Sequence, residues 1–129
     1  MSQLSAFIAG NTLGRPMNRG AQSATLDASP TTLVLNATST SGELQVQGEI
    51  LVLDPGGSTR AVYLPPVGAS KGMIIRLLNS ADATENLTIT ELAAGALATA
   101  ASAEVLRQEM AVCICDGTDW YVQVQNLDT

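Results

Sequence analysis

A stretch of alternating side chains near the middle of the chain limits the folds open to it. In ELQVQGEILVLD, residues 43–54, four apolar side chains share one parity: Leu44, Val46, Ile50 and Val52. Gln45, Gln47 and Glu49 hold the opposite parity. Alternation of this length predicts a half-buried strand with its apolar side chains turned inward. Gly48 keeps the inward parity, which favours a bulge or a close approach of backbone at that point.

Other runs of strand length follow at short spacing, separated by turn residues. They are TTLVLNA (31–37), RAVYLPP (60–66), GMIIRLLN (72–79), NLTITE (86–91), MAVCICD (110–116) and WYVQVQ (120–125). Pro65-Pro66 ends the second run, because proline cannot donate to a strand ladder. The more continuously apolar GMIIRLLN is expected to be buried on both faces. About eight short strands predict one all-β domain over residues 29–129, either a β-sandwich or a jelly roll.

The alanine-rich segment LAAGALATAASAEVLRQ, residues 92–108, is open to two interpretations. Its alanines, together with Glu104 and Arg107, suit a helix on intrinsic propensity. Gly95 interrupts it, however, and the segments on both sides have strand character. We favour a loop of small residues that leads into a short strand near residues 104–107.

The first 28 residues show neither a strand period nor a helix period, and glycine and proline punctuate them. We therefore expect an extended N-terminal arm over residues 1–28. Its apolar and cationic side chains are the candidate anchors for docking on a neighbouring molecule: Leu4, Phe7, Ile8, Leu13, Arg15 and Arg19. Residues 1–22 carry two arginines and no acid, whereas the remainder carries four bases and twelve acids, a charge of −8. The alternative is that the two arginines are there by chance.

Composition argues against several classes of function. The chain has no histidine, which removes the Ser-His-Asp and Cys-His arrangements and the common zinc sites. A net charge of −6 disfavours direct binding to nucleic acid, which requires clustered lysine and arginine. No apolar run approaches the roughly twenty residues that cross a bilayer. The start of the chain does not resemble a secretory signal, so we expect synthesis in a reducing cytoplasm.

The segment CICDGTDWYVQV, residues 113–124, contains the residues most open to a chemical interpretation. Cys113 and Cys115 supply only two sulfur ligands, whereas a tetrahedral zinc site requires four. We therefore favour a role for both cysteines as small buried side chains over a metal-binding site. Asp116 and Gly117 suit a turn between two strands better than a calcium loop or a catalytic carboxylate pair. Trp120 suits a core position better than a platform for sugar stacking. We therefore expect no catalytic residue, metal or cofactor, and no enzyme.

Two longer segments carry a resemblance. VYLPPVGASKGMIIRLLNSADATENLTITEL and MAVCICDGTDWYVQVQ resemble a β-rich module common in structural proteins of tailed bacteriophages. In that module a strand ends in Leu-Pro, a Gly opens the next strand and an Asn closes it; a Leu-Thr-Ile-like strand and a final Asp-Gly hairpin with Trp follow. The matching positions here are Leu64-Pro65, Gly72, Asn79, Leu87-Thr88-Ile89, Asp116-Gly117 and Trp120.

The resemblance covers roughly half the chain, and with a single arm it is most similar to capsid decoration (cement) proteins. It implies a virion protein, often a homotrimer, that is made in the host cytoplasm and bound to the major capsid protein on the outer surface of the head. Such a protein stabilises the shell by bridging capsomers. The alternative is a head-fibre or tail component involved in host attachment. A hydrolase of cell-wall sugars would need paired carboxylates in a cleft, for which Asp116 and Asp119 are the candidates.

Overall fold

The structure of the protein is a computed structural model that describes residues 20–35, 42–91 and 96–127. The described residues form ten strands and one short 3₁₀ helix joined by loops, which confirms the all-β class. In chain order these are β1 (Ala21–Thr25), β2 (Thr31–Val34), β3 (Glu43–Gln45), β4 (Ile50–Asp54), β5 (Arg60–Leu64), η2 (Val67–Ala69), β6 (Ile74–Asn79), β7 (Leu87–Glu91), β8 (Ala103–Val105), β9 (Glu109–Cys115) and β10 (Trp120–Asn126). In the described part of the chain, no helix is long and apolar enough to span a membrane.

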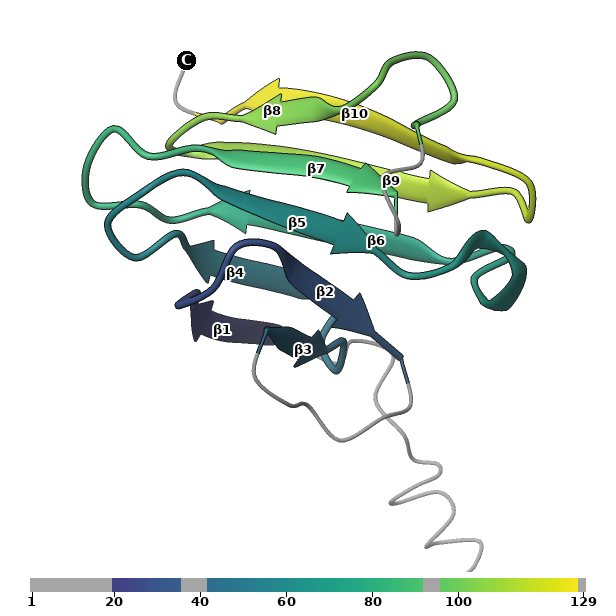
Figure 1. Ribbon diagram of the computed structural model, residues 1–129, viewed down its shortest axis with the longest axis horizontal. Helices are drawn as coiled ribbons and strands as arrows, with labels where there is room; N and C mark the ends of the chain where they lie inside the picture. Colours follow the sequence, from purple (N-terminus) through teal and green to yellow (C-terminus); the bar gives the residue numbers. More distant parts are fainter. Residues whose placement is uncertain (1–19, 36–41, 92–95, 128–129) are drawn as a thin grey trace, which may run out of the picture.

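The strands form two five-stranded sheets. Sheet A has the order β1-β4-β6-β9-β10, and sheet B has the order β3-β2-β5-β7-β8. In Figure 1 both sheets run from the purple and dark blue strands at the lower end (β1 and β3) to the green and yellow strands at the upper end (β8 and β10). Neighbouring positions in each sheet therefore broadly follow the order of the chain.

The chain reaches this arrangement by passing back and forth between the two sheets. Strands β4 and β6 belong to sheet A, and the intervening β5 belongs to sheet B together with β7. Strands β4 and β6 are consequently parallel, as are β5 and β7, because a crossover through the other sheet separates the two members of each pair. Antiparallel pairs occur at β7 with β8, β6 with β9 and β9 with β10. A jelly roll is built from antiparallel pairs, so the parallel pairings are not those expected of that alternative.

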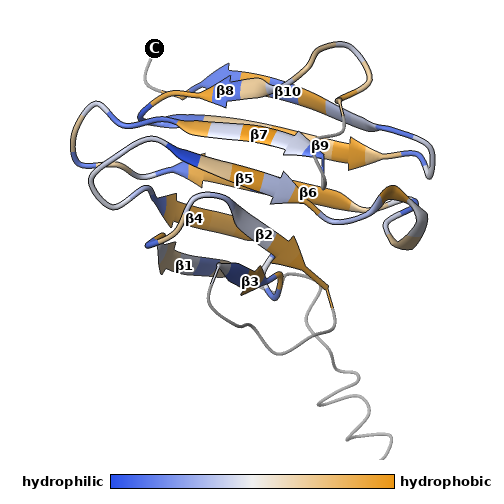
Figure 2. Ribbon diagram, viewed as in Figure 1, coloured by the Kyte–Doolittle hydropathy of each residue, from blue (hydrophilic) through white to orange (hydrophobic). Residues whose placement is uncertain are grey.

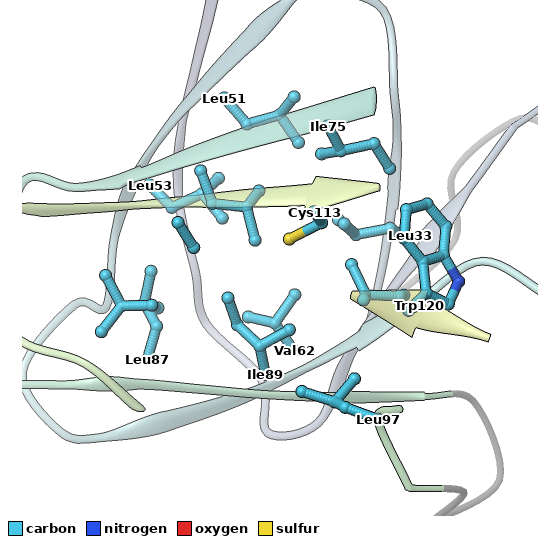
Figure 3. Close-up of a cluster of buried hydrophobic side chains, with 14 of the residues drawn as sticks. Leu33, Leu51, Leu53, Val62, Ile75, Leu87, Ile89, Leu97, Cys113 and Trp120 are labelled. Atoms are coloured by element: carbon cyan, nitrogen blue, oxygen red, sulfur yellow. The ribbon is translucent and has the colours of Figure 1, made fainter. Parts of the chain in front are cut away.

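One hydrophobic core lies between the sheets and takes side chains from both. Leu51, Leu53 and Ile75 enter it from sheet A, and Val62 and Ile89 enter it from sheet B, all five with at most 1% exposure. Figure 3 shows these side chains converging, with Trp120 and Leu97 at the margin of the cluster. Aliphatic side chains dominate, as expected for a chain with 3% aromatic residues.

The single strand predicted over residues 43–54 is wrong. The segment forms β3 of sheet B and β4 of sheet A, and the chain changes sheets around Gly48. Beyond that point the inward parity is inverted: Leu51 and Leu53 are fully buried, whereas Ile50 is 36% exposed. The close backbone approach expected at Gly48 is confirmed, since a Cβ there would lie 2.9 Å from the carbonyl oxygen of Gly20.

The segment 21–25 was expected to end the arm, but it forms β1 and pairs in parallel with β4. The side chain of Gln22 also joins this strand to the β3–β4 connection. Its Nε2 donates to the carbonyl of Gln45 at 2.7 Å, and its Oε1 accepts from the backbone N–H of Gln47 at 2.8 Å. The folded body therefore begins before residue 29, while residues 1–19 of the expected arm lie outside the described residues.

Part of the alanine-rich segment is also described. Residues 96–102 form no helix or strand, and β8 follows at Ala103–Val105. For these residues the loop leading into a short strand is confirmed, although the strand begins one residue earlier than predicted. Leu97 is 6% exposed and packs in the core, which ties this loop to the body.

Candidate functional site

The candidate site is the outer face of sheet A, the side turned away from the core. Side chains alternate along a strand, so the neighbours of buried residues such as Leu51, Ile75 and Cys113 point outward. The strand register places these outward residues in three rows across the sheet. The rows are Ile74-Ile114-Tyr121, Ala21-Ile50-Arg76-Val112-Gln123 and Ser23-Val52-Leu78-Met110-Gln125.

Apolar side chains are contiguous over the middle of this face. Ile74, Ile114 and Tyr121 form one row and are 47%, 44% and 44% exposed. Figure 2 shows orange over much of β4, β6 and β9, the strands of sheet A that are mainly apolar at both inward and outward positions. Single exposed apolar residues are ordinary, but a contiguous patch usually marks a surface that binds something.

The expectation that GMIIRLLN is buried on both faces is wrong for the isolated chain. On β6, Ile75 and Leu77 are buried in the core, whereas Ile74 is exposed and Leu78 is half-buried. Sequence analysis recognised the unusual apolar content of this strand but assigned it to the interior. A strand that is apolar on both sides has the same sequence whether its outer side is buried or is left uncovered by the described residues.

The charges and hollows of the face lie around the apolar patch. Asp54 and Arg76 are the only ionisable Asp, Glu, Lys or Arg residues in the outward positions of β1, β4, β6, β9 and β10. A hollow of about 260 Å³ over β9 and β10 is lined partly by Ile114, Tyr121 and Thr99. A second hollow of about 360 Å³ lies near the opposite edge, beside Asp54.

The predicted hairpin around Asp116 and Gly117 is present and supports the edge of this face. The Asp116 Oδ1 accepts hydrogen bonds from the backbone N–H groups of Thr118 at 2.8 Å and Asp119 at 2.9 Å. These bonds, that from Asp119 first, lower the pKa of the Asp116 carboxyl. Its Oδ2 accepts from the Tyr121 hydroxyl at 3.2 Å, which raises the pKa of that phenol. Gly117 has a φ of 96°, a conformation that glycine adopts without strain.

Trp120 starts β10 and points the other way, into the core. It is fully buried, and its indole Nε1 donates to the carbonyl of Pro65 at 2.9 Å. The core position expected for this residue is therefore confirmed. Asp116 stabilises the turn between β9 and β10, and Trp120 anchors the start of β10 in the core. Because side chains alternate along the strand, Tyr121 lies on the outer face.

Cys113 and Cys115 are both buried as free thiols, as the favoured interpretation predicted. Burial raises the pKa of the Cys113 thiol to about 12. A thiol with that pKa carries almost no thiolate near neutral pH, and thiolate is the form that binds metals and attacks electrophiles. Within residues 20–35, 42–91 and 96–127, no three His, Cys, Asp or Glu side chains are grouped so that they could hold a metal ion.

The remaining candidate residues belong to the arm and lie outside the described residues: Leu4, Phe7, Ile8, Leu13, Arg15 and Arg19. The structure thus places one predicted element, the Asp116 hairpin, at the edge of the apolar outer face of sheet A, a surface that sequence analysis missed. Comparison with protein-family models, curated proteins and solved structures finds no match to this chain.

Proposed function

We propose that this chain is a virion structural protein: a capsid decoration protein that binds the outer surface of a bacteriophage head. The observation that carries the proposal is the contiguous apolar outer face of sheet A on an all-β body. An uncovered apolar face is typical of proteins that function in assemblies. The resemblance of residues 62–92 and 110–125 to the phage structural module supports the same role.

In this proposal the two sheets form a rigid sandwich-like body, and the arm binds the shell. The apolar side chains of residues 1–19 pack on the major capsid protein, and Arg15 and Arg19 meet acidic groups there. A protein that bridges capsomers stabilises the expanded lattice by its binding free energy, because it binds the assembled shell and not the separated subunits. The chain acts as a homotrimer made in the host cytoplasm, without catalysis, cofactor or direct contact with nucleic acid.

The test is deletion of residues 1–19, followed by cosedimentation with purified heads that lack this protein. The deletion stops before Gly20, because the carbonyl of Gly20 accepts a hydrogen bond from Glu49 at 3.0 Å and β1 follows directly. We expect head binding to fall at least about tenfold, a loss of about 1.4 kcal/mol, with the unfolding transition unchanged.

Two substituted proteins divide the arm's contribution. Replacing Leu4, Phe7, Ile8 and Leu13 by serine removes the apolar anchors, and Arg15→Gln with Arg19→Gln removes the charges. The first change is expected to reproduce the deletion, and the second to weaken binding mainly at low salt. Full binding by the deleted chain, or binding to isolated tails instead of heads, would contradict the proposal.

A further inference from the structure

We propose that the outer face of sheet A is the contact between copies of this chain. The proposal deepens, and rests on, the assembly role proposed above. The arm and the outer face of sheet A then have separate partners: the arm binds the shell, and the face binds a second copy of the chain. The chemistry of the face identifies that occupant in three steps.

The first step is charge. The whole chain carries −6, so two copies repel each other at most approaches. The outward positions of the sheet A strands hold one acid, Asp54, and one base, Arg76, and are therefore neutral. Repulsion between copies is least where this face is buried, and its apolar rows gain most from leaving water.

The second step is complementarity. Arg76 lies beside Ile50 in the strand register, and Asp54 lies four residues farther along β4, about 13 Å away along the strand. Val52 and Leu78 are register partners halfway between the two charges. If Arg76 of one copy faces Asp54 of another, the apolar centre of each face is buried between them. Both partners of an ion pair are thus present on one patch, as association of identical faces requires.

The third step is availability. Within the described residues, the Arg76 guanidinium has no hydrogen-bond or ion-pair partner. Asp54 accepts a bond from the Gly56 N–H through Oδ1 at 2.9 Å, which fixes its carboxylate at the end of β4. The hollows beside Asp54 and beside Tyr121 leave room for side chains of a second copy at both ends of the patch.

The experiment is sedimentation velocity of the full chain over a range of concentrations, without heads. Ile74→Lys and Ile114→Lys place a charge in the apolar patch, and Leu106→Lys is the matched control. Leu106 is 46% exposed, close to the 44% of Ile114, but it lies in the turn before β9 and outside the face. Lysine reduces the net negative charge of the chain, so general repulsion cannot explain a loss of association.

We expect the two face variants to dissociate at least tenfold more readily than the wild type, and Leu106→Lys to remain within twofold of it. Thermal unfolding of each variant confirms that the body is folded. A monomeric wild type, or equal association of all variants, would overturn the inference. If the face variants associate normally but lose head binding, the face belongs to the capsid protein: the inference then fails and the decoration role stands.

Charge exchange tests the pairing directly. Asp54→Arg and Arg76→Asp should each weaken association, and both changes in one chain should restore it. Mixing the two single variants separates the symmetries. A two-fold dimer of one copy of each variant has opposite charges at both of its 54–76 contacts, so association is restored. A ring of three must contain two copies of one variant, so one of its three contacts joins like charges and association is restored only in part. Failure of the double variant to recover any association would overturn the Arg76–Asp54 contact.

Discussion

The two sheets have similar inner faces and different outer faces. Inside, both contribute fully buried aliphatic side chains to one core. Outside, sheet B presents the rows Thr32-Tyr63-Thr90 and Ala61-Thr88-Glu104. The inner strands β4, β6 and β9 of sheet A instead present isoleucine, valine, leucine and methionine around Arg76, with Asp54 at the end of β4. Folding of the body requires only the inner faces. The outer face of sheet A is therefore apolar for another reason.

Threonine shows what a solvated sheet surface needs. It has the β-branch that suits a strand, and its hydroxyl remains compatible with water. Sheet B uses it at three central positions of its outer face, so this chain can build a polar sheet exterior. The isoleucines at matching central positions of sheet A agree with the contact between copies that we propose.

The largest effect is expected where the inner faces are broken. Trp120→Ala should lower the free energy of unfolding by about 3–5 kcal/mol, because it empties a fully buried site and leaves the Pro65 carbonyl without its donor. Tyr121→Ala, one residue later on the outer face, should cost about 1 kcal/mol or less. Urea unfolding of both variants measures the difference. Equal losses would show that the outer face also belongs to the folding core.

Sequence reasoning located most strands and the final hairpin because period-2 patterns, Pro65-Pro66 and Asp116-Gly117 are local signals. Sequence reasoning did not predict that the chain passes back and forth between two sheets. Alternation shows which side of a strand is apolar, but it does not show to which sheet the strand belongs. The inverted parity beyond Gly48 is an instance: the pattern of residues 43–54 looks continuous although the chain changes sheets within it. The apolar outer face was missed because an outward apolar side of a strand has the same composition as a side that the fold buries.

A smaller effect on stability is expected from making the two outer faces alike. Ile74→Thr with Ile114→Thr keeps the β-branch at both positions and removes the apolar row beside Tyr121. The free energy of unfolding should fall by only about 1–2 kcal/mol, since both side chains are more than 40% exposed. Self-association, followed by sedimentation velocity, should weaken far more than stability does.

The reciprocal change is Thr88→Ile on the outer face of sheet B. One isoleucine among threonines and Glu104 does not create a contiguous patch, so association should be unchanged. Stronger self-association of this variant would show that overall apolar content matters more than the rows of sheet A.

The smallest effect concerns the rim of the face, where Asp116 holds the turn and the Tyr121 hydroxyl. The pKa of Asp116 is lowered in the folded protein, mainly by the N–H groups of Asp119 and Thr118. Its contribution to stability is therefore complete above the unfolded pKa of about 3.9 and is lost as the pH falls through the lower folded pKa. The raised pKa of Tyr121 acts oppositely: its contribution is complete below about pH 10 and is lost as the pH rises through the higher folded value.

Both groups are exposed, so the shifts in melting temperature with pH should be small. Asp116→Asn should remove the acid-side dependence due to this residue and reduce the alkaline one. Tyr121→Phe should remove the alkaline dependence and reduce the acid-side one only slightly, because the Tyr121 hydroxyl is a minor cause of the lowered pKa of Asp116. Melting temperatures of the three proteins from pH 2.5 to 11 distinguish these outcomes. If Asp116→Asn leaves the alkaline limb unchanged, the Asp116–Tyr121 bond does not persist in solution, and this bond does not hold Tyr121 on the face.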